Sequence, residues 1–269
     1  MEDPYGEITR TQKEFVRSRS ADFDARGWTV DYRNNLLQPL HPDTLTDFIA
    51  RDEVTPDGRG DRISAPHSST ALAVNTFDWW RGRDLRRLSA AVGISLDRCT
   101  GFEQQHGFGF DRPAQLDVEF VESDGTAVGV EVKLREPYGG VSNTFADRYF
   151  ETPSLWDGLS ILATLARRIR FEVDPPFVTL HAAQLIKHTL GMHHSYGERF
   201  TLVYFWHRRP GTVGNAHAGE VERFAELVQP EISFVPVTVG ELLENFEPDT
   251  GSQAWFDYMT ERYLSRARH

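Results

Sequence analysis

The sequence predicts an α/β (α+β) domain in which helices cover both faces of a mixed β-sheet. Its 269 residues are 39% hydrophobic and 26% charged, which is enough apolar material for a sizeable core. Short apolar runs typical of strands occur in two groups, and segments with helical periodicity precede, separate and follow them. The longest apolar run, residues 201–206, is far shorter than the roughly 20 residues that cross a bilayer, so no transmembrane helix is expected.

Charge and cysteine content narrow the functional class. Forty acidic and 29 basic residues give a net charge of −11, which disfavours indiscriminate binding to nucleic acid or anionic lipid. The single cysteine, Cys99, excludes intramolecular disulfides and thiolate zinc fingers, and it fits a reducing compartment. The N-terminus has neither a basic start nor an apolar segment, so it does not predict a secretory signal. We therefore expect a cytoplasmic protein without a membrane partner.

The N-terminal part of the chain is expected to consist of helices and one long loop. Three helices are predicted here, over residues 7–23, from Asp43 onward, and from a cap at Ser68 or Ser69 toward Leu88. Residues 52–68 are rich in Pro, Gly and charge, which is typical of a functional or mobile loop. The expected domains are an N-terminal helical extension and loop at residues 1–64 and a sheet-containing domain at residues 65–269.

The rest of the chain is expected to form the sheet and the helices that cover it. Apolar runs predict strands at residues 94–104, 116–122, 127–134, 199–206 and 232–239. Helical periodicity predicts helices at residues 154–170, 180–192, 240–246 and 255–264. This order of elements favours a mixed sheet.

The second and third expected strands meet in a hairpin whose register can be deduced. A three-residue loop that ends in Gly125 places Asp117 opposite Glu131. One face then carries Leu116, Val118, Phe120, Val128, Val130, Val132 and Leu134, and the other carries Asp117, Glu119, Gly129, Glu131 and Lys133. A two-residue turn would mix polar and apolar residues on both faces, so the register with one apolar face is preferred.

Three carboxylates and one lysine are thus expected to converge on the polar face of the hairpin. Neighbouring carboxylates repel each other, and a shared proton or a shared cation is the usual reason to tolerate this. Oxygen ligands favour Mg²⁺ or Mn²⁺, and a lysine beside a metal-bound water can orient it, help to deprotonate it or neutralise developing charge. The pattern indicates a hydrolytic centre; the alternative is a solvated strand face with a Lys–Glu pair that contributes little.

The order Asp117, then 13 residues, then Glu131-Val132-Lys133 resembles the catalytic signature of the PD-(D/E)xK nuclease superfamily. The segments HSSTALAVNTF, GVEVKLREPY and HAAQLIKHTLGM are similar, in this order, to a branch of bacterial restriction-endonuclease-like proteins. The resemblance covers the middle of the chain and implies a restriction-endonuclease-like fold. No proline directly precedes Asp117, since Pro113 is four residues earlier, and many members share that departure.

The resemblance also implies roles for individual residues. Asp117, Glu131 and the main-chain carbonyl of Val132 would hold Mg²⁺, with Mn²⁺ able to substitute, while Lys133 would act on the attacking water. Glu103 looks like the upstream glutamate that many of these nucleases add to the metal site; the alternative is an ordinary exposed glutamate. No other cofactor is expected.

One expected helix is similar to the Gln-x-x-x-Tyr helix that supports the active site and contacts DNA in related nucleases. Gln184 is the matching glutamine, whereas His188 stands at the tyrosine position. Lys187 and His188 lie one helical turn after Gln184, so the three side chains can point toward one site. The alternative for His188 is a surface or helix-end histidine, because the histidines do not match zinc-ligand spacing.

Arginine clusters are the candidate DNA contacts, because an acidic protein must concentrate its cations to approach a polyanion. The candidates are Arg81, Arg83, Arg86 and Arg87 on one expected helix, Arg167, Arg168 and Arg170 on another, and Arg135 and Lys187 singly. Each has an alternative as a solvated helix end or a loop salt bridge.

The expected function is Mg²⁺-dependent hydrolysis of phosphodiester bonds in nucleic acid, with DNA the favoured substrate and defence against foreign DNA or repair as its setting. The first alternative is a non-catalytic nucleic-acid-binding or regulatory module on the same fold. The second is a metal-dependent hydrolase of small phosphoesters, because the chain is acidic. A homodimer is compatible with the sequence.

Overall fold

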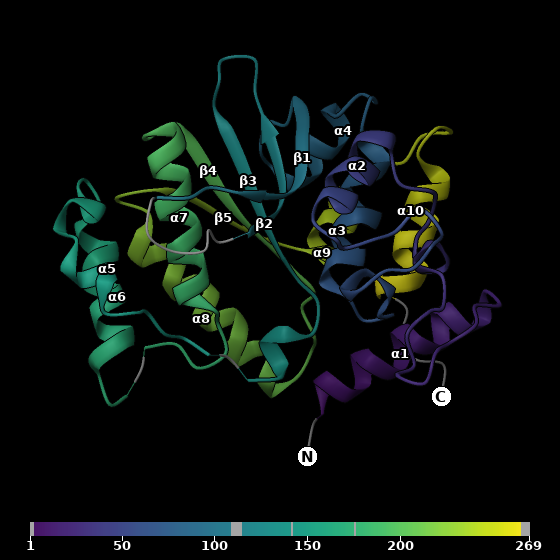
Figure 1. Ribbon diagram of the computed structural model, residues 1–269, viewed down its shortest axis with the longest axis horizontal. Coiled ribbons are helices and arrows are strands. Elements are labelled where there is room, and N and C mark those ends of the chain that lie inside the picture. Colours follow the sequence, from purple (N-terminus) through teal and green to yellow (C-terminus); the bar gives the residue numbers. More distant parts are fainter. Residues whose placement is uncertain (1–2, 109–114, 141, 175, 265–269) are drawn as a thin grey trace.

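The centre of the protein is a five-stranded mixed sheet in the order β1-β2-β3-β4-β5 (Figure 1). The computed structural model describes residues 3–108, 115–140, 142–174 and 176–264. Its strands are β1 (Arg98–Gln105), β2 (Gln115–Val121), β3 (Ala127–Lys133), β4 (Phe200–Trp206) and β5 (Ser233–Thr238). The first three strands are antiparallel, and β4 and β5 continue from β3 in parallel. The mixed α/β sheet predicted from the sequence is confirmed.

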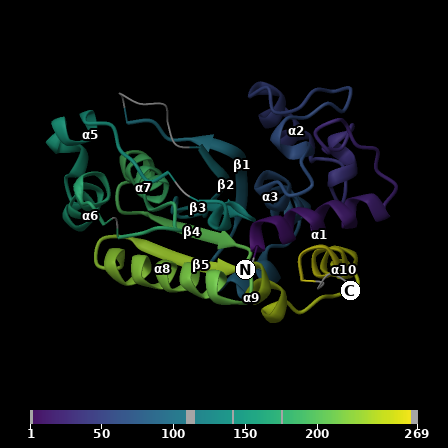
Figure 2. The ribbon, with the colours of Figure 1, turned by 90° about the horizontal axis from the view of Figure 1, so that it is seen from below.

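Helices pack on both sides of this sheet, as Figures 1 and 2 show. The α-helices of the described residues are α1 (Pro4–Ser18), α2 (Pro42–Ala50), α3 (Ser69–Phe77), α4 (Arg86–Val92), α5 (Arg148–Glu151), α6 (Ser160–Phe171), α7 (Ala182–Tyr196), α8 (Thr212–Val228), α9 (Val239–Asn245) and α10 (Gln253–Met259). Shorter 3₁₀ turns are η1 (Tyr32–Asn35), η2 (Arg62–Ser64), η3 (Asp78–Trp80), η4 (Glu136–Tyr138) and η5 (Pro153–Trp156), and η6 (Thr260–Leu264) is a π-helical turn. Within these described ranges, no helix combines the length and hydrophobicity that a bilayer crossing requires.

Two apolar cores lie on the two faces of the sheet. On one face, Val130 and Phe205 belong to a core that includes side chains of α3, α4, α9 and α10. On the other face, Leu202 and Tyr204 belong to a core that includes side chains of α6, α7 and α8. Because neighbouring residues of a strand point to opposite faces, β4 contributes to both cores in alternation.

The β2–β3 hairpin has the register that the sequence predicted. Its pairs run from Val121 opposite Ala127 to Val118 opposite Val130. The prediction was wrong for Leu116, which is buried with the second core and not with Val118. Gly129 explains this, because a Cβ there would lie 2.9 Å from Leu116 Cδ1 and 2.5 Å from Met192 Sδ. The missing side chain leaves space that Leu116 and Met192 fill.

The helix expected between residues 68 and 88 is broken into α3, η3 and α4. Ser68 caps α3 as predicted, and its Oγ accepts a hydrogen bond from the Ala71 amide at 3.2 Å. The chain leaves the helical path at Gly82, whose φ is +72°. Arg81 and Arg83 therefore lie in the turn, and the other two arginines of this cluster, Arg86 and Arg87, begin α4.

The helix α8 between β4 and β5 was not predicted. Parallel neighbours cannot be joined by a tight turn, so the chain needs a long crossover between these strands. The spacing of Val221, Phe224 and Val228, which are all buried in the second core, is that of one helical face. The sequence therefore carries the helical signal of α8.

The N-terminal and C-terminal parts of the chain are joined by Arg262, which is 1% exposed. Its guanidinium donates to Gln12 Oε1, to the Asn35 carbonyl and side chain, to the Tyr258 hydroxyl and to the Pro66 carbonyl. Residues such as Phe48 and Ile63 share a core with the sheet. Side chains on both sides of the expected boundary at residues 64 and 65 thus pack together.

Candidate active site

The end of β3 carries the glutamate and the lysine of the predicted signature on one face. Lys133 Nζ contacts Glu131 Oε1, and both side chains are buried. His188, from α7, lies on the other side of this carboxylate, with Nε2 2.8 Å from Glu131 Oε2. Burial acts to raise the pKa of Glu131, but the charges of Lys133 and His188 outweigh burial and lower that pKa to about 2. Glu131 is therefore ionised.

Lys133 is held in its charged form. Burial acts to lower the pKa of Lys133, whereas Glu131, Glu136 and Asp117 raise it, and the net effect is a pKa above the usual value. The ammonium group consequently remains protonated at neutral pH in this arrangement.

Asp117 comes from β2 and faces the same site. Its Oδ2 accepts a hydrogen bond of 2.7 Å from the Val132 amide. Burial of the carboxyl group raises the pKa of Asp117 well above its usual value, and Glu131 and Glu103 raise it further; Lys133 and the Val132 amide oppose this but do not offset it. In the metal-free protein, Asp117 therefore tends to keep its proton and does not add a second negative charge beside Glu131. Pro113, the nearest proline before Asp117, lies outside the described residues.

Glu103 joins this group from β1, where Phe102 pairs with Val118 and Gln104 pairs with Leu116. It is 3% exposed, so it is not the exposed glutamate that the sequence left open. Burial raises the pKa of Glu103 to about 7. Arg62, 3.6 Å away, lowers this pKa, whereas the charges of Glu53 and Glu131 raise it further. Its φ of +54° is rare for a residue with a side chain, and such strain concentrates at functional sites.

Glu119 does not join the cluster, contrary to the expectation that three carboxylates of the hairpin converge. Its carboxylate contacts His106 Nε2 and accepts hydrogen bonds from Thr100 Oγ1 at 3.2 Å and from the Tyr196 hydroxyl at 3.1 Å. Glu119 is two residues from Asp117 and pairs with Gly129, so it lies farther back along the hairpin. Glu103 on β1 takes the place that the sequence assigned to Glu119.

These residues match a divalent metal ion in donor chemistry. Asp117, Glu131 and Glu103 offer carboxylate oxygens, which Mg²⁺ and Mn²⁺ prefer, and their repulsion is what a cation would relieve. Within the described ranges, no three Asp, Glu, His or Cys side chains converge closely enough to hold a metal ion. Lys133 contacts the Glu131 carboxylate, and the Val132 amide donates a hydrogen bond to Asp117. The carboxylate oxygens therefore lie at the same site but are not arranged around a single position that a metal ion could occupy.

The three polar side chains expected on α7 separate in the structure. His188 reaches Glu131 and is 2% exposed, so it is not a surface histidine. Gln184 lies one turn earlier on the same side of α7 and is partly buried. Lys187 turns away, with Nζ 5.4 Å from the ring centre of Phe145.

The arginine candidates occupy varied surroundings. Arg81 is buried, with its guanidinium 5.6 Å from the ring centre of Phe102, whereas the remaining three of its cluster are exposed. Arg83 donates to the Trp79 carbonyl, Arg86 pairs with Asp84, and Arg87 pairs with Asp249. On α6, Arg167 lies over the Phe150 ring, Arg168 pairs with Glu172 and Arg170 pairs with Asp147.

A small cavity of about 150 Å³ lies beside the carboxylate cluster, and two arginines and the acidic Glu136 are among the residues that line it. Arg62 and Arg135 line it together with His67 and Trp28. Arg62 is the same residue that approaches Glu103, and Arg135 follows Lys133 by two positions. Arg62 was not singled out from the sequence; the one signal was its place in the long loop at residues 52–68.

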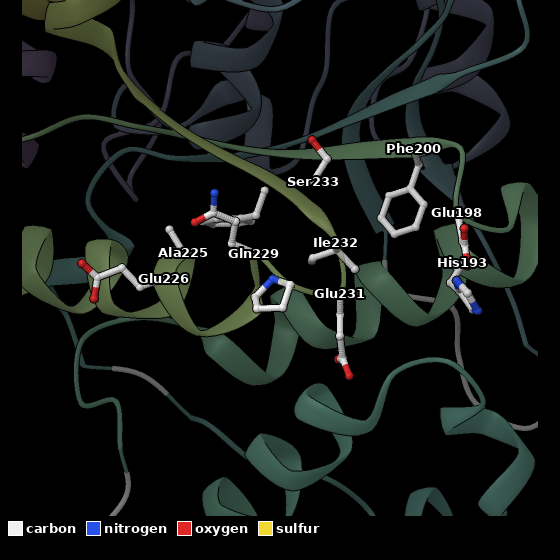
Figure 3. A pocket seen from close by; sticks show the side chains of 11 residues that line it. His193, Glu198, Phe200, Ala225, Glu226, Gln229, Glu231, Ile232 and Ser233 are labelled. Atoms are coloured by element: carbon white, nitrogen blue, oxygen red, sulfur yellow. The ribbon is translucent and has the colours of Figure 1, made fainter.

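A larger cavity of about 580 Å³ lies elsewhere (Figure 3). Phe200, which begins β4, lines this cavity, whereas Lys133 pairs with Trp206 at the other end of β4. Six residues of strand separate the two places by about 20 Å. Glu231, which Figure 3 shows at the cavity, accepts hydrogen bonds from the first amides of α6. This cavity is therefore separate from the carboxylate cluster.

The mixed sheet covered on both faces, with an Asp, Glu and Lys cluster at its central hairpin, defines a restriction-endonuclease-like α/β protein. The sequence model of the family described as Restriction Endonuclease associating with ARP matches residues 10–264, so the chain belongs to this family. Membership confirms the resemblance to restriction-endonuclease-like proteins and implies a nuclease. The match begins ahead of the expected domain boundary at residue 65. No curated protein and no solved structure matches the chain.

Proposed function

We propose that the protein is a Mg²⁺-dependent nuclease that hydrolyses phosphodiester bonds in DNA, with Mn²⁺ able to substitute. The observation that carries the proposal is the group of Asp117, Glu131 and Lys133 at one buried site in a member of a restriction-endonuclease family. Carboxylates that repel each other lower the stability of the fold, and groups with perturbed pKa values concentrate at functional sites. Catalysis is the role that accounts for this cost.

The residues have distinct roles in this proposal. Asp117, Glu131 and the Val132 carbonyl would hold the metal ion, with Glu103 as a further oxygen donor. When bound, Mg²⁺ would lower the pKa of a water molecule and stabilise negative charge on the phosphate. Lys133, which is charged in the metal-free protein, would donate a hydrogen bond to a reacting oxygen.

The two arginines of the cavity beside the site support an approach of the phosphate backbone from that side. Arg62 and Arg135 supply positive charge there, and Trp28 supplies an aromatic surface. Gln184, on the His188 side of α7, is the proposed support on the opposite flank. The exposed arginines Arg83, Arg86 and Arg87 remain a second proposed contact, together with Lys187. The family description names an association with ARP, and a partner protein could add binding surface to this acidic chain.

A cleavage assay tests the proposal. Purified protein is incubated with plasmid, linear duplex or single-stranded DNA, in Mg²⁺ or in EDTA. We expect Mg²⁺-dependent cleavage that Asp117→Ala abolishes without changing the circular dichroism spectrum. Asp157→Ala, which removes an exposed aspartate ahead of α6, is the matched control and should retain activity. Cleavage by Asp117→Ala at the wild-type rate would refute the site, and hydrolysis of small phosphoesters alone would refute the DNA substrate.

A further inference from the structure

The first turn of α3 lies at the wall of the small cavity beside the carboxylate cluster. Ser69 and Thr70 begin this helix, and both line the cavity. Their amides have no hydrogen-bond acceptor among the residues that the structure describes, and the first turn carries no acidic side chain. The aligned peptide dipoles make such a helix end positive, so it favours an anion.

Thr70 also offers a hydroxyl group at this place. The residue is 3% exposed, and within the described ranges its hydroxyl group forms no hydrogen bond. The hydroxyl oxygen is not enclosed by protein atoms, and since Thr70 lines the cavity, the space that this oxygen reaches is the cavity. Buried polar side chains usually have a partner. The hydroxyl group therefore indicates a polar ligand independently of the helix end.

A cation without an acidic partner lines the same cavity. Arg135 is partly buried, and burial lowers its pKa, although Tyr5 and Glu136 act against this. It forms no ion pair with a described residue. Its Nη1 donates to Thr9 Oγ1 at 2.9 Å, and its guanidinium lies 4.3 Å from the ring centre of Tyr5. These contacts fix the guanidinium and leave its other N–H groups for an anion.

Glu136 is the acidic residue of the cavity wall, and its carboxylate is already bound. Its Oε2 accepts hydrogen bonds of 2.9 Å from the amides of Leu134 and Arg135. Arg62, the other arginine of the wall, is shared with Glu53 and Glu103. The donors that remain for a ligand are therefore those of α3 and Arg135.

We propose that this cavity is a subsite for a phosphate monoester, with which the protein recognises the phosphorylated end of a nucleic-acid strand. The inference rests on the proposed nuclease function and names the part of the substrate that the same site takes. A phosphate monoester carries a charge of about −1.5 to −2 and three acceptor oxygens, which match the helix end, the Thr70 hydroxyl group and Arg135. A phosphodiester inside a strand has less charge and fewer free oxygens, and its chain would have to leave the cavity again.

The size and the position of the cavity agree with this ligand. Its volume of about 150 Å³ is below the roughly 300–1,000 Å³ of sites for drug-sized ligands, so it suits one phosphate group and not a whole nucleotide. Arg62 lies 3.6 Å from Glu103, and Arg135 follows Lys133 by two positions. A strand end held in the cavity would thus bring a neighbouring phosphodiester bond close to the carboxylates.

The competing explanation is a hydrated hollow in which water molecules satisfy the amides and the hydroxyl group. A strand that ends in a phosphate would then bind no more tightly than one that ends in a hydroxyl group. The affinity ratio of the two kinds of end separates the explanations.

Fluorescence anisotropy in EDTA measures this ratio for the full chain without cleavage. The ligands are oligonucleotides of one sequence that carry a 5′-phosphate, a 3′-phosphate or hydroxyl groups alone. We expect the wild type to prefer one phosphorylated end by more than about tenfold, because charge-assisted hydrogen bonds are the strong ones. Thr70→Val and Arg135→Gln should each remove most of this preference, whereas Thr164→Val, which changes an exposed threonine of α6, should keep it. Equal affinity for all three ligands, or a preference that either cavity variant retains, would overturn the inference.

Nuclear magnetic resonance with inorganic phosphate locates the subsite without any variant. The amide signals of Ser69 and Thr70 should shift, whereas those of Ile161 and Leu162, which already donate to Glu231, should not. Unchanged Ser69 and Thr70 signals would also overturn the inference. If Mg²⁺-dependent cleavage occurs without an end preference, this inference is wrong and the proposed function stands. If the end preference is found without cleavage, the proposed function fails and the phosphate subsite stands.

Discussion

Replacing Glu103 with glutamine is expected to stabilise the metal-free protein at neutral and alkaline pH. Glu103 is 3% exposed, and burial together with Glu53 and Glu131 raises its pKa to about 7, although Arg62 opposes this. Glutamine has nearly the same shape and carries no charge. The substitution therefore removes the cost of a buried anion while it keeps the packing of β1.

The magnitude follows from the pKa. The difference between the ordinary pKa of 4.5 and about 7 corresponds to at most about 3–4 kcal/mol, at about 1.4 kcal/mol per pH unit. The folded protein holds this proton more tightly than the unfolded chain does. Protonation of Glu103 therefore stabilises the fold fully below about pH 4.5, and this contribution is lost as the pH rises through about 7. The variant should match the wild type at the acidic end of this window and exceed it by up to about 3–4 kcal/mol at the alkaline end.

Urea denaturation in EDTA across this pH range, followed by tryptophan fluorescence, measures the difference. Glu14→Gln, which changes an exposed glutamate of α1, is the control and should alter the unfolding free energy little at any pH. Added Mn²⁺ should stabilise the wild type more than Glu103→Gln, because a cation that binds the folded state adds to its stability. The reasoning is refuted if Glu103→Gln gains no stability above neutral pH, or if its gain is the same at every pH.

Three further predictions concern Lys133, Arg262 and Arg62. Lys133→Arg should lose most cleavage activity because the guanidinium is larger and planar, and Lys133→Met should lose nearly all of it. Calorimetry should show that both variants still bind Mn²⁺. Full activity of the arginine variant would reduce Lys133 to a countercharge. Arg262→Met removes five hydrogen bonds to buried acceptors and should lower the unfolding free energy by about 3–5 kcal/mol, and an unchanged urea midpoint would contradict this. Arg62→Ala should weaken DNA binding and reduce the slope of log K against log salt by about 1. Arg59→Ala, in the same loop, is the control and should leave the affinity and the slope unchanged. Equal slopes for the two variants would mean that DNA binds elsewhere.

The sequence by itself determined the sheet and the β2–β3 hairpin that carries the proposed site. The β2–β3 register was predictable because Gly125 at the end of a short loop and one apolar face admit a single pairing. Glu131 and Lys133 followed from the same alternation, since residues two apart in a strand share a face. These are local properties that need no knowledge of the rest of the fold.

Tertiary structure decided which distant side chains complete the site. The periodicity of α7 places Gln184 and His188 on one side of a helix, but packing of α7 against the sheet decides that this side meets Glu131. In the same way, the pairing of β1 with β2 brings Glu103 to the cluster, while Glu119 lies farther back along the hairpin. Contacts between segments far apart in the chain depend on how whole elements pack, and short-range periodicity carries no information about that packing.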